Sequence, residues 1–287
     1  MNYHKIKKFV QLAKPRIVMM VLVTTTIGFY LGEKGFYSIF KLIMTLVGTA
    51  LATGGASALN NYLERDVDAL MERTCRRALP QGDIQADHAL LYGVTLVLCG
   101  VSVLAFTTNL LSSFLVLLAA FIYVLVYTPM KRISWWNTTI GAIPGAIPPL
   151  VGWAAATGSL DAVAWILFLI LFTWQHPHFY AIAWMYRDDY RRGGFKMLPV
   201  VDPEGKRTFR HILVYTLALI VISVFPVFLG ITRMFYLVGV LFLGGLFLAV
   251  SLRFLKSKTH QDAKNVFKIS LVYLPVYLIL VILDLSF

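Results

Sequence analysis

The chain has 287 residues, of which 59% are hydrophobic and 14% are charged, and its mean hydropathy is +0.74. Soluble domains carry roughly 45–50% apolar and about 25% charged residues, so the composition excludes a soluble globular domain, a disordered chain and a disulfide scaffold. The formal net charge of +12 would suggest nucleic-acid binding in a soluble protein, but in a membrane protein it first reflects topology. The sequence predicts an all-α, polytopic integral membrane protein.

Nine apolar runs are long enough to cross a bilayer, which takes about 20 residues per helix. They cover residues 17–32, 38–58, 88–108, 110–128, 138–157, 162–185, 211–230, 234–252 and 269–286. The stretch between the third and fourth runs is nearly continuous, and we divide it at Thr107, Thr108 and Asn109 because about 40 residues is twice the length of one span. Nine spans make residues 1–287 a single membrane domain.

Nine spans place the two ends of the chain on opposite sides of the membrane. With a cytoplasmic N-terminus, 23 of the 26 lysines and arginines fall on the cytoplasmic side, and only Lys34, Lys41 and Arg233 fall outside. The positive-inside rule therefore predicts a cytoplasmic N-terminus and an outside C-terminus. The membrane that we expect is a cytoplasmic (inner) membrane of bacterial type. Function is expected in the two long cytoplasmic loops, about 59–87 and 186–210.

Four acidic residues lie within nine positions after the second span: Glu64, Asp66, Asp68 and Glu72. No proline precedes them, so the helix should continue, with Asn60, Glu64 and Asp68 on one face, Glu72 one turn further and Asp66 pointing away. Like charges at this spacing destabilise a bare helix, and Mg²⁺ prefers oxygen ligands of this kind. The alternative is a solvated loop whose acids pair with its own arginines.

The pattern Asn-x-x-x-acid-x-x-x-Asp, followed by Arg-Thr-x-x-Arg-x-Leu-Pro-x-Gly, runs from Asn60 to Gly82. It resembles the first aspartate-rich motif of the UbiA-type intramembrane prenyltransferases. That resemblance implies a bundle of nine membrane helices with motif loops after helices two and six. Two positions depart from the family pattern: Glu64 replaces the usual Asp, and Ala78 replaces a common Pro. Neither change removes an oxygen ligand.

Two further segments resemble the family. Tyr127-Thr128-Pro129-Met130-Lys131-Arg132 ends the fourth span, and two adjacent cations there could hold a diphosphate or serve only as a positive-inside anchor. After the sixth span, quinone-type members carry a second Asp-x-x-x-Asp, whereas this chain has Asp188 and Asp189 between Tyr186 and Tyr190, so that pair is incomplete.

The segment Trp174-Gln175-His176-Pro177-His178-Phe179, the Asp-Tyr pair and Met197-Leu198-Pro199-Val200-Val201 are similar to the heme O synthase (protoheme IX farnesyltransferase) branch of that superfamily. Histidines within or beside a span are functional candidates, and a His nitrogen commonly ligates heme iron. We predict heme binding at His178 and His176, with His178 favoured. A histidine that only bonds a carbonyl is the alternative.

The resemblance implies transfer of the farnesyl group of farnesyl diphosphate to a vinyl group of heme B with addition of water, giving heme O and diphosphate for heme A and terminal oxidase biogenesis. Mg²⁺ is the implied cofactor; membrane lipid and a downstream heme A synthase are implied partners. The predicted catalytic residues are Glu64, Asp66, Asp68 and Asp189, and the metal ligands are Asn60, Glu64, Asp68 and Asp189. The predicted diphosphate ligands are Arg73, Arg77, Lys131 and Arg132. Aromatic faces stabilise an allylic cation, and the candidates are Tyr127, Trp174, Tyr186 and Tyr190, although aromatic residues also form the ordinary interfacial belt.

Some alternatives stay open. The small residues of 141–149 in the fifth span could serve close helix packing or leave room for a flat macrocycle. A prenyltransferase with a quinone-precursor aromatic acceptor is the first rival function, and a heme-binding assembly factor without catalysis is the second. A transporter is disfavoured, because its charges should lie near the bilayer midplane and here they cluster at the cytoplasmic edge.

Overall fold

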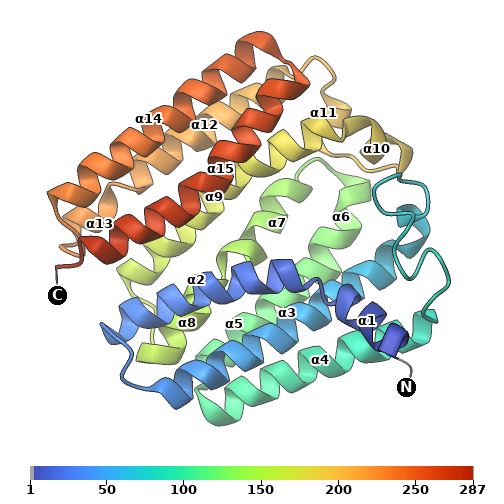
Figure 1. The fold of residues 1–287 in the computed structure, drawn as a ribbon, viewed down its shortest axis with the longest axis horizontal. Helices are drawn as coiled ribbons and strands as arrows, with labels where there is room; N and C mark the ends of the chain where they lie inside the picture. The colour runs from blue at the N-terminus through green and yellow to red at the C-terminus, as the bar shows by residue number, and fades with distance from the viewer. Residues whose placement is uncertain (1–2, 287) are drawn as a thin grey trace.

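The computed structural model describes residues 3–286, and that part of the chain contains nine helical spans long and apolar enough to cross a membrane. Within it no strand forms, apart from an isolated bridge between Thr232 and Leu285. The all-α, nine-span architecture is therefore confirmed. The spans lie side by side in one bundle, and the two ends of the chain lie at opposite ends of that bundle (Figure 1).

Six spans are single helices. They are α2 (Pro15–Glu33), α3 (Ile39–Asp68), α4 (Ala86–Thr107), α9 (Ala162–Met185), α14 (Met234–Ser257) and α15 (His260–Leu283), and a short α1 (Tyr3–Leu12) precedes them. The predicted division between the third and fourth spans is confirmed, because Asn109 caps the next helix by accepting a hydrogen bond from the Ser112 N–H at 2.8 Å.

Three spans are interrupted. The fourth consists of α5 (Leu110–Phe121), a π-helical segment η1 (Ile122–Tyr127) and α6 (Thr128–Ile133). The fifth divides into α7 (Asn137–Ala146) and α8 (Pro148–Thr157), because the Pro148 ring lacks the N–H that a continuous helix needs. The seventh divides into α12 (Lys206–Ile222) and α13 (Phe225–Phe228).

Two predicted boundaries were wrong. The ninth span was expected to begin at residue 269, but α15 begins at His260, where Thr259 accepts a hydrogen bond from the Asp262 N–H. The first turns of α15 contain charged residues, so a prediction based on apolar runs did not include them. The seventh span was expected to begin at residue 211, but α12 begins at Lys206. The loop before it contains two short helices, α10 (Arg187–Arg192) and α11 (Leu198–Val201).

Glycines bring the helices into close contact. A Cβ added to Gly28 of α2 would lie 2.0 Å from the Pro149 carbonyl oxygen, and one added to Gly152 of α8 would lie 1.9 Å from the Thr25 carbonyl oxygen. In the fifth span, a Cβ at Gly145 would lie 2.0 Å from the Gln175 side-chain oxygen. Close packing is therefore what these small residues provide.

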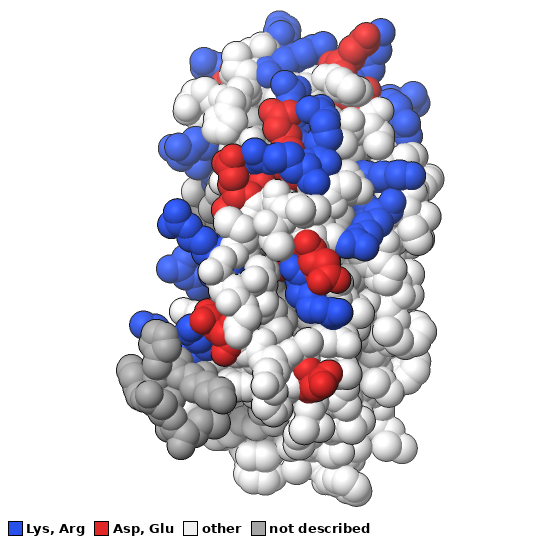
Figure 2. Space-filling view, turned by 90° about the vertical axis from the view of Figure 1, so that its right-hand side faces the viewer, with Lys and Arg blue, Asp and Glu red and all other residues white. Residues whose placement is uncertain are grey.

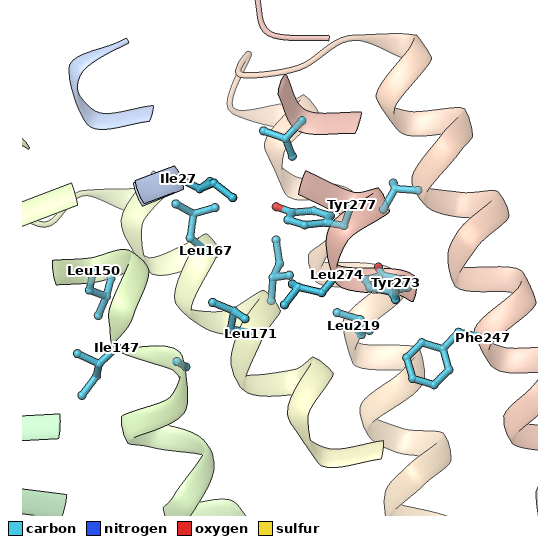
Figure 3. Packing of buried hydrophobic residues seen from close by; sticks show 14 of the residues in the cluster. Ile27, Ile147, Leu150, Leu167, Leu171, Leu219, Phe247, Tyr273, Leu274 and Tyr277 are labelled. Carbon is cyan, nitrogen blue, oxygen red and sulfur yellow. The ribbon is translucent and has the colours of Figure 1, made fainter. Parts of the chain in front are cut away.

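An apolar pocket lies between α2, α8, α9 and α15. Its walls include Ile27, Leu167, Leu171, Leu274 and Tyr277, and Figure 3 shows these side chains converging from α2, α9 and α15. Charged side chains gather instead at one end of the bundle, where α1, α10 and the segment 69–85 lie (Figures 1 and 2). We call this the charged end.

Candidate active site

The acidic row of α3 is formed as the spacing predicts. The helix continues to Asp68, and Asn60, Glu64 and Asp68 are 1%, 6% and 1% exposed. The expected extension of the row to Glu72 was wrong, because the helix ends and the exposed Glu72 side chain pairs with Arg192 at 2.7 Å. Asp66 points away from the row: its side chain is 80% exposed and lies 3.7 Å from the Arg65 guanidinium.

Each member of the row is paired with a cation. Lys14 Nζ donates to Asn60 Oδ1 at 2.7 Å, Lys131 Nζ donates to Glu64 Oε1 at 2.7 Å, and Arg77 Nη1 donates to Asp68 Oδ2 at 2.6 Å. The charge balance of this cluster is positive, with three cations against two carboxylates. A cluster of this kind suits a highly anionic ligand, for which Arg and Lys are the usual protein donors.

Lys14 was not among the predicted site residues. It directly precedes α2, and its only sequence signal was one more positive charge near the N-terminus. Burial, together with the nearby Arg77 and Lys131 charges, lowers the pKa of Lys14 to about 7. A like-charged neighbourhood opposes its protonation, so an anion bound here would restore the charged form.

The orientation of the Asn60 amide is fixed by Thr128. The Thr128 hydroxyl donates its single proton to the Tyr123 carbonyl at 2.8 Å and accepts from Asn60 Nδ2 at 3.0 Å. The Tyr123 carbonyl is reachable because η1 is π-helical: the Thr128 N–H also bonds to it, five residues back. Asn60 therefore presents its amide oxygen, not its amide nitrogen, to the cluster.

The cation pair at the end of the fourth span is divided. Lys131 joins the row and lies 4.5 Å above the Tyr127 ring, whereas Arg132 is exposed. The one-residue offset on a helix rotates the side chain by about 100°, which accounts for the difference. The structure thus brings Lys131 and Tyr127 to the acidic row and leaves Arg132 at the surface.

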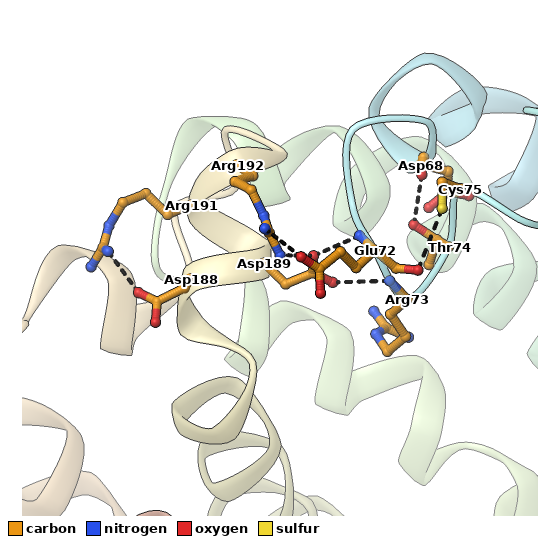
Figure 4. A network of polar contacts seen from close by, with 9 residues as sticks. All are labelled: Asp68, Glu72, Arg73, Thr74, Cys75, Asp188, Asp189, Arg191 and Arg192. Carbon is orange, nitrogen blue, oxygen red and sulfur yellow. Dashed lines mark hydrogen bonds and ion pairs between the residues drawn. The ribbon is translucent and has the colours of Figure 1, made fainter.

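Asp189 connects the two motif loops (Figure 4). Its Oδ1 accepts from the Glu72 N–H at 2.8 Å and from Arg192 Nη2 at 3.0 Å, and the Arg73 N–H lies 3.5 Å from Oδ2. The Arg73 guanidinium carbon is 5.8 Å from the centroid of Tyr186 and 5.7 Å from that of Tyr190. A pocket between the loops is lined in part by Arg73, Tyr186 and Asp189.

A metal fits the row through one atom in particular. Asp68 Oδ1 is buried and has no hydrogen-bond partner within residues 3–286, and a buried carboxylate oxygen in that state is an open ligand position. The described residues contain no group of three or more His, Cys, Asp or Glu side chains placed to hold a metal. Asp189 lies apart from the row, where its oxygens accept from Arg192 and from backbone N–H groups of the opposite loop.

The two histidines lie inside α9 and not in a loop, because Pro177 does not end that helix. His176 is 0% exposed; its ring nitrogens lie 2.7 Å from the Phe172 carbonyl oxygen and 3.3 Å from Thr139 Oγ1, and it stacks on Tyr215 at 3.5 Å. His178 is less enclosed, and only its Nδ1 has a hydrogen-bond partner among the described residues.

Trp174 belongs with His178 and is not grouped with the other three candidate aromatic residues. Its indole stacks on the His178 imidazole with ring centroids 5.0 Å apart, and its Nε1 donates to the Ser270 carbonyl at 2.7 Å. The aromatic candidates therefore divide into two places: Tyr127, Tyr186 and Tyr190 at the charged end, and Trp174 along the α9–α15 contact.

Comparison with known proteins identifies the family. The model of the UbiA prenyltransferase family matches residues 21–272, which is most of the chain. The chain belongs to the UbiA prenyltransferase family. It is accordingly a prenyltransferase enzyme and an integral membrane protein. A curated relative from Solibacter usitatus, named protoheme IX farnesyltransferase, is 44% identical over 97% of this chain and 98% of its own length.

Solved structures share the UbiA fold. A structure described for digeranylgeranylglyceryl phosphate synthase superposes with a TM-score of 0.83, at 18% identity and 98% coverage of both chains. A UbiA homologue from Archaeoglobus fulgidus bound to GPP and Mg²⁺ gives a TM-score of 0.66 at 19% identity, covering 96% of this chain and 99% of that one. In that homologue GPP and Mg²⁺ are bound together.

Proposed function

We propose that this UbiA-family enzyme transfers the farnesyl group of farnesyl diphosphate to a vinyl group of heme B, giving heme O and diphosphate. The observation that carries the proposal is the 44% identity, over nearly the whole of both chains, to a protein named protoheme IX farnesyltransferase. The half-buried His178, with one ring nitrogen unengaged among the described residues, adds a group that can bind a heme substrate.

In this reaction the C–O bond between farnesyl C1 and the diphosphate breaks, and C1 bonds to the terminal vinyl carbon of heme B. Water adds to the inner vinyl carbon and loses a proton. Negative charge develops on the leaving diphosphate, so donors fixed in advance lower the barrier. Lys14, Arg77 and Lys131 are such donors at the row, and Arg73 is one at the loop pocket.

Mg²⁺ bound at Asn60, Glu64 and Asp68, with Asp189 opposite, would neutralise charge on the diphosphate. Lys14, Lys131 and Arg77 donate hydrogen bonds to one oxygen each of Asn60, Glu64 and Asp68. In the proposed reaction they turn to the diphosphate oxygens when the substrate enters. Tyr127, Tyr186 and Tyr190 offer ring faces to the allylic cation.

The decisive experiment incubates the purified protein with heme B, farnesyl diphosphate and Mg²⁺, followed by mass analysis of the pigment. The expected product is heme B plus one farnesyl group and one water. Two parallel reactions replace heme B with an aromatic quinone precursor or farnesyl diphosphate with geranylgeranyl diphosphate. Prenylation of the quinone precursor alone would overturn the proposal in favour of a quinone-type acceptor, and heme binding without any transfer would favour an assembly factor.

The biological setting follows from the same proposal. The enzyme lies in the cytoplasmic membrane with its charged end, N-terminus and motif loops on the cytoplasmic side, and its heme O passes to a heme A synthase. The concentration of lysines and arginines at the charged end supports this orientation (Figure 2).

A further inference from the structure

Ser270 of α15 makes two contacts with α9 at one position. Its hydroxyl oxygen lies 2.8 Å from His178 Nδ1, and its backbone carbonyl accepts from Trp174 Nε1 at 2.7 Å. The His178 ring is also flanked by Trp174 and Phe267, with centroid distances of 5.0 Å and 5.1 Å. The imidazole is therefore held in one place by groups from two helices.

The single proton of the Ser270 hydroxyl determines the tautomer of the His178 imidazole. Ser270 Oγ lies 2.6 Å from the Phe267 carbonyl oxygen and donates its one proton there. A hydroxyl has a single proton, so toward His178 the Ser270 oxygen acts as acceptor and Nδ1 must carry the hydrogen. In the neutral ring the lone pair then resides on Nε2, which has no hydrogen-bond partner among the described residues.

The His178 imidazole lies between the apolar pocket and the charged end of the bundle. On α9, Leu171 and His178 are seven residues apart and share a face; on α15, Ser270 and Leu274 are four apart and share a face. Leu171 and Leu274 both line the apolar pocket. Seven residues of helix span about 10 Å, so the imidazole lies beyond the pocket, in the direction of Asp189 and the charged end.

We propose that Ser270 is a positioning residue for the heme substrate, holding His178 as the Nδ1–H tautomer so that Nε2 ligates the heme iron. This inference rests on the proposed function. A metal-ligating histidine characteristically donates its other N–H to an oxygen acceptor, which sets the ring orientation and raises the basicity of the ligating nitrogen. His176 has no such arrangement, because both of its nitrogens contact protein oxygens within the bundle.

The test is a titration of heme B into purified protein, followed by the Soret band, with binding of farnesyl diphosphate and Mg²⁺ as a measure of folding. Ser270→Ala should weaken heme binding about 10-fold and shift the Soret band, with diphosphate binding unchanged. Ser270→Thr keeps the hydroxyl and should bind heme as the wild type does. Ser251→Ala removes a buried serine hydroxyl from α14 and should have no effect on either ligand.

A double-mutant comparison separates positioning from packing. In a His178→Phe background, Ser270→Ala should cause no further loss of heme affinity, because the group it positions is gone. Equal losses in both backgrounds would overturn the proposal, as would wild-type heme binding by Ser270→Ala or weak binding by Ser270→Thr. Failure of the wild type to farnesylate heme B would instead refute the proposed function, so the two failures are distinguishable.

Discussion

Asp68 combines the properties of a metal ligand more completely than any other residue of the acidic row. One of its oxygens is bound by Arg77, and the other is buried without a partner in the described chain. Leaving a buried acceptor unsatisfied costs about 1–3 kcal/mol, and a bound cation would recover that cost. The residue is thus placed for function at the expense of stability.

Asp68→Asn should reduce turnover roughly 100-fold or more, because it removes a charged oxygen ligand, while the protein still folds and binds heme. Chelation of the wild type with EDTA should have the same result, and activity that persists in metal-free buffer would contradict the assignment. Asp87→Asn is a matched control, since Asp87 is exposed in the first turn of α4; it should retain activity. Glu64→Asp should be mild, because it keeps a carboxylate and restores the residue usual in the family.

Thr128→Val should raise the Mg²⁺ concentration needed for half-maximal activity by about 10-fold, since the amide of Asn60 would no longer be held with its oxygen toward the cluster. Thr128→Ser keeps the hydroxyl and should behave as the wild type. Thr45→Val is the control: Thr45 is also buried, but its hydroxyl bonds only to its own helix. An unchanged Mg²⁺ requirement in Thr128→Val would show that Thr128 does not orient Asn60.

The sequence predicted part of this site well and part of it poorly. Asn60, Glu64 and Asp68 were found because helical periodicity is local and needs no knowledge of packing. Lys14 and Thr128 were missed because their roles depend on contacts across 46 and 68 residues of chain. His176 and His178 looked nearly equivalent, yet two residues rotate a helix by about 200°, so one side chain contacts Tyr215 and the other contacts α15.

At the scale of elements, the distance between neighbouring helices depends on glycines. At these glycines a backbone carbonyl of the next helix lies where a Cβ would otherwise be. The pair Gly28 and Gly152 holds α2 against α8, and the pair Gly48 and Gly100 does the same for α3 and α4: a Cβ on Gly100 would lie 2.4 Å from the Gly48 carbonyl oxygen. Small residues at helix contacts allow this approach in membranes, where van der Waals packing replaces the hydrophobic effect.

Gly152→Ala should therefore destabilise the protein, by about 1–3 kcal/mol as other overpacking substitutions do, because the new methyl group meets backbone that cannot rotate away. Thermal unfolding in detergent should show a lower midpoint. Gly245 of α14 has no atom within 4 Å of an added Cβ, so Gly245→Ala should leave the midpoint unchanged or slightly raised by the better helix propensity of alanine. Equal midpoints for Gly152→Ala and the wild type would contradict this account of the α2–α8 contact.

The number of membrane spans was easier to predict than their local helix geometry and their exact ends. Nine apolar runs gave nine spans because bilayer thickness sets their length. The π-helical segment before Thr128 and the early start of α15 at His260 left no trace in hydropathy, since both depend on hydrogen bonds: the first on a five-residue register, the second on a cap at Thr259.

For the whole molecule, the sequence divides the lysines and arginines 23 to 3 between the two sides, and the structure gathers charge at the end of the bundle that carries the motif loops (Figure 2). Reporter fusions placed after Lys196 and after Phe287 should therefore report opposite sides of the membrane, with the Lys196 fusion cytoplasmic. The same side for both fusions would refute the nine-span topology, and a Lys196 fusion outside the cytoplasm would refute the orientation.

The pairing of the acidic row also has a consequence for the order in which the protein is built. Lys14, Arg77 and Lys131, which neutralise the row, all precede residue 132, so these contacts are available as soon as the first four spans have entered the bilayer. The link from Asp189 to the N–H groups of Glu72 and Arg73 must wait until the sixth span is in place. During synthesis the charge of the acidic row is thus balanced early, and the two loops join later.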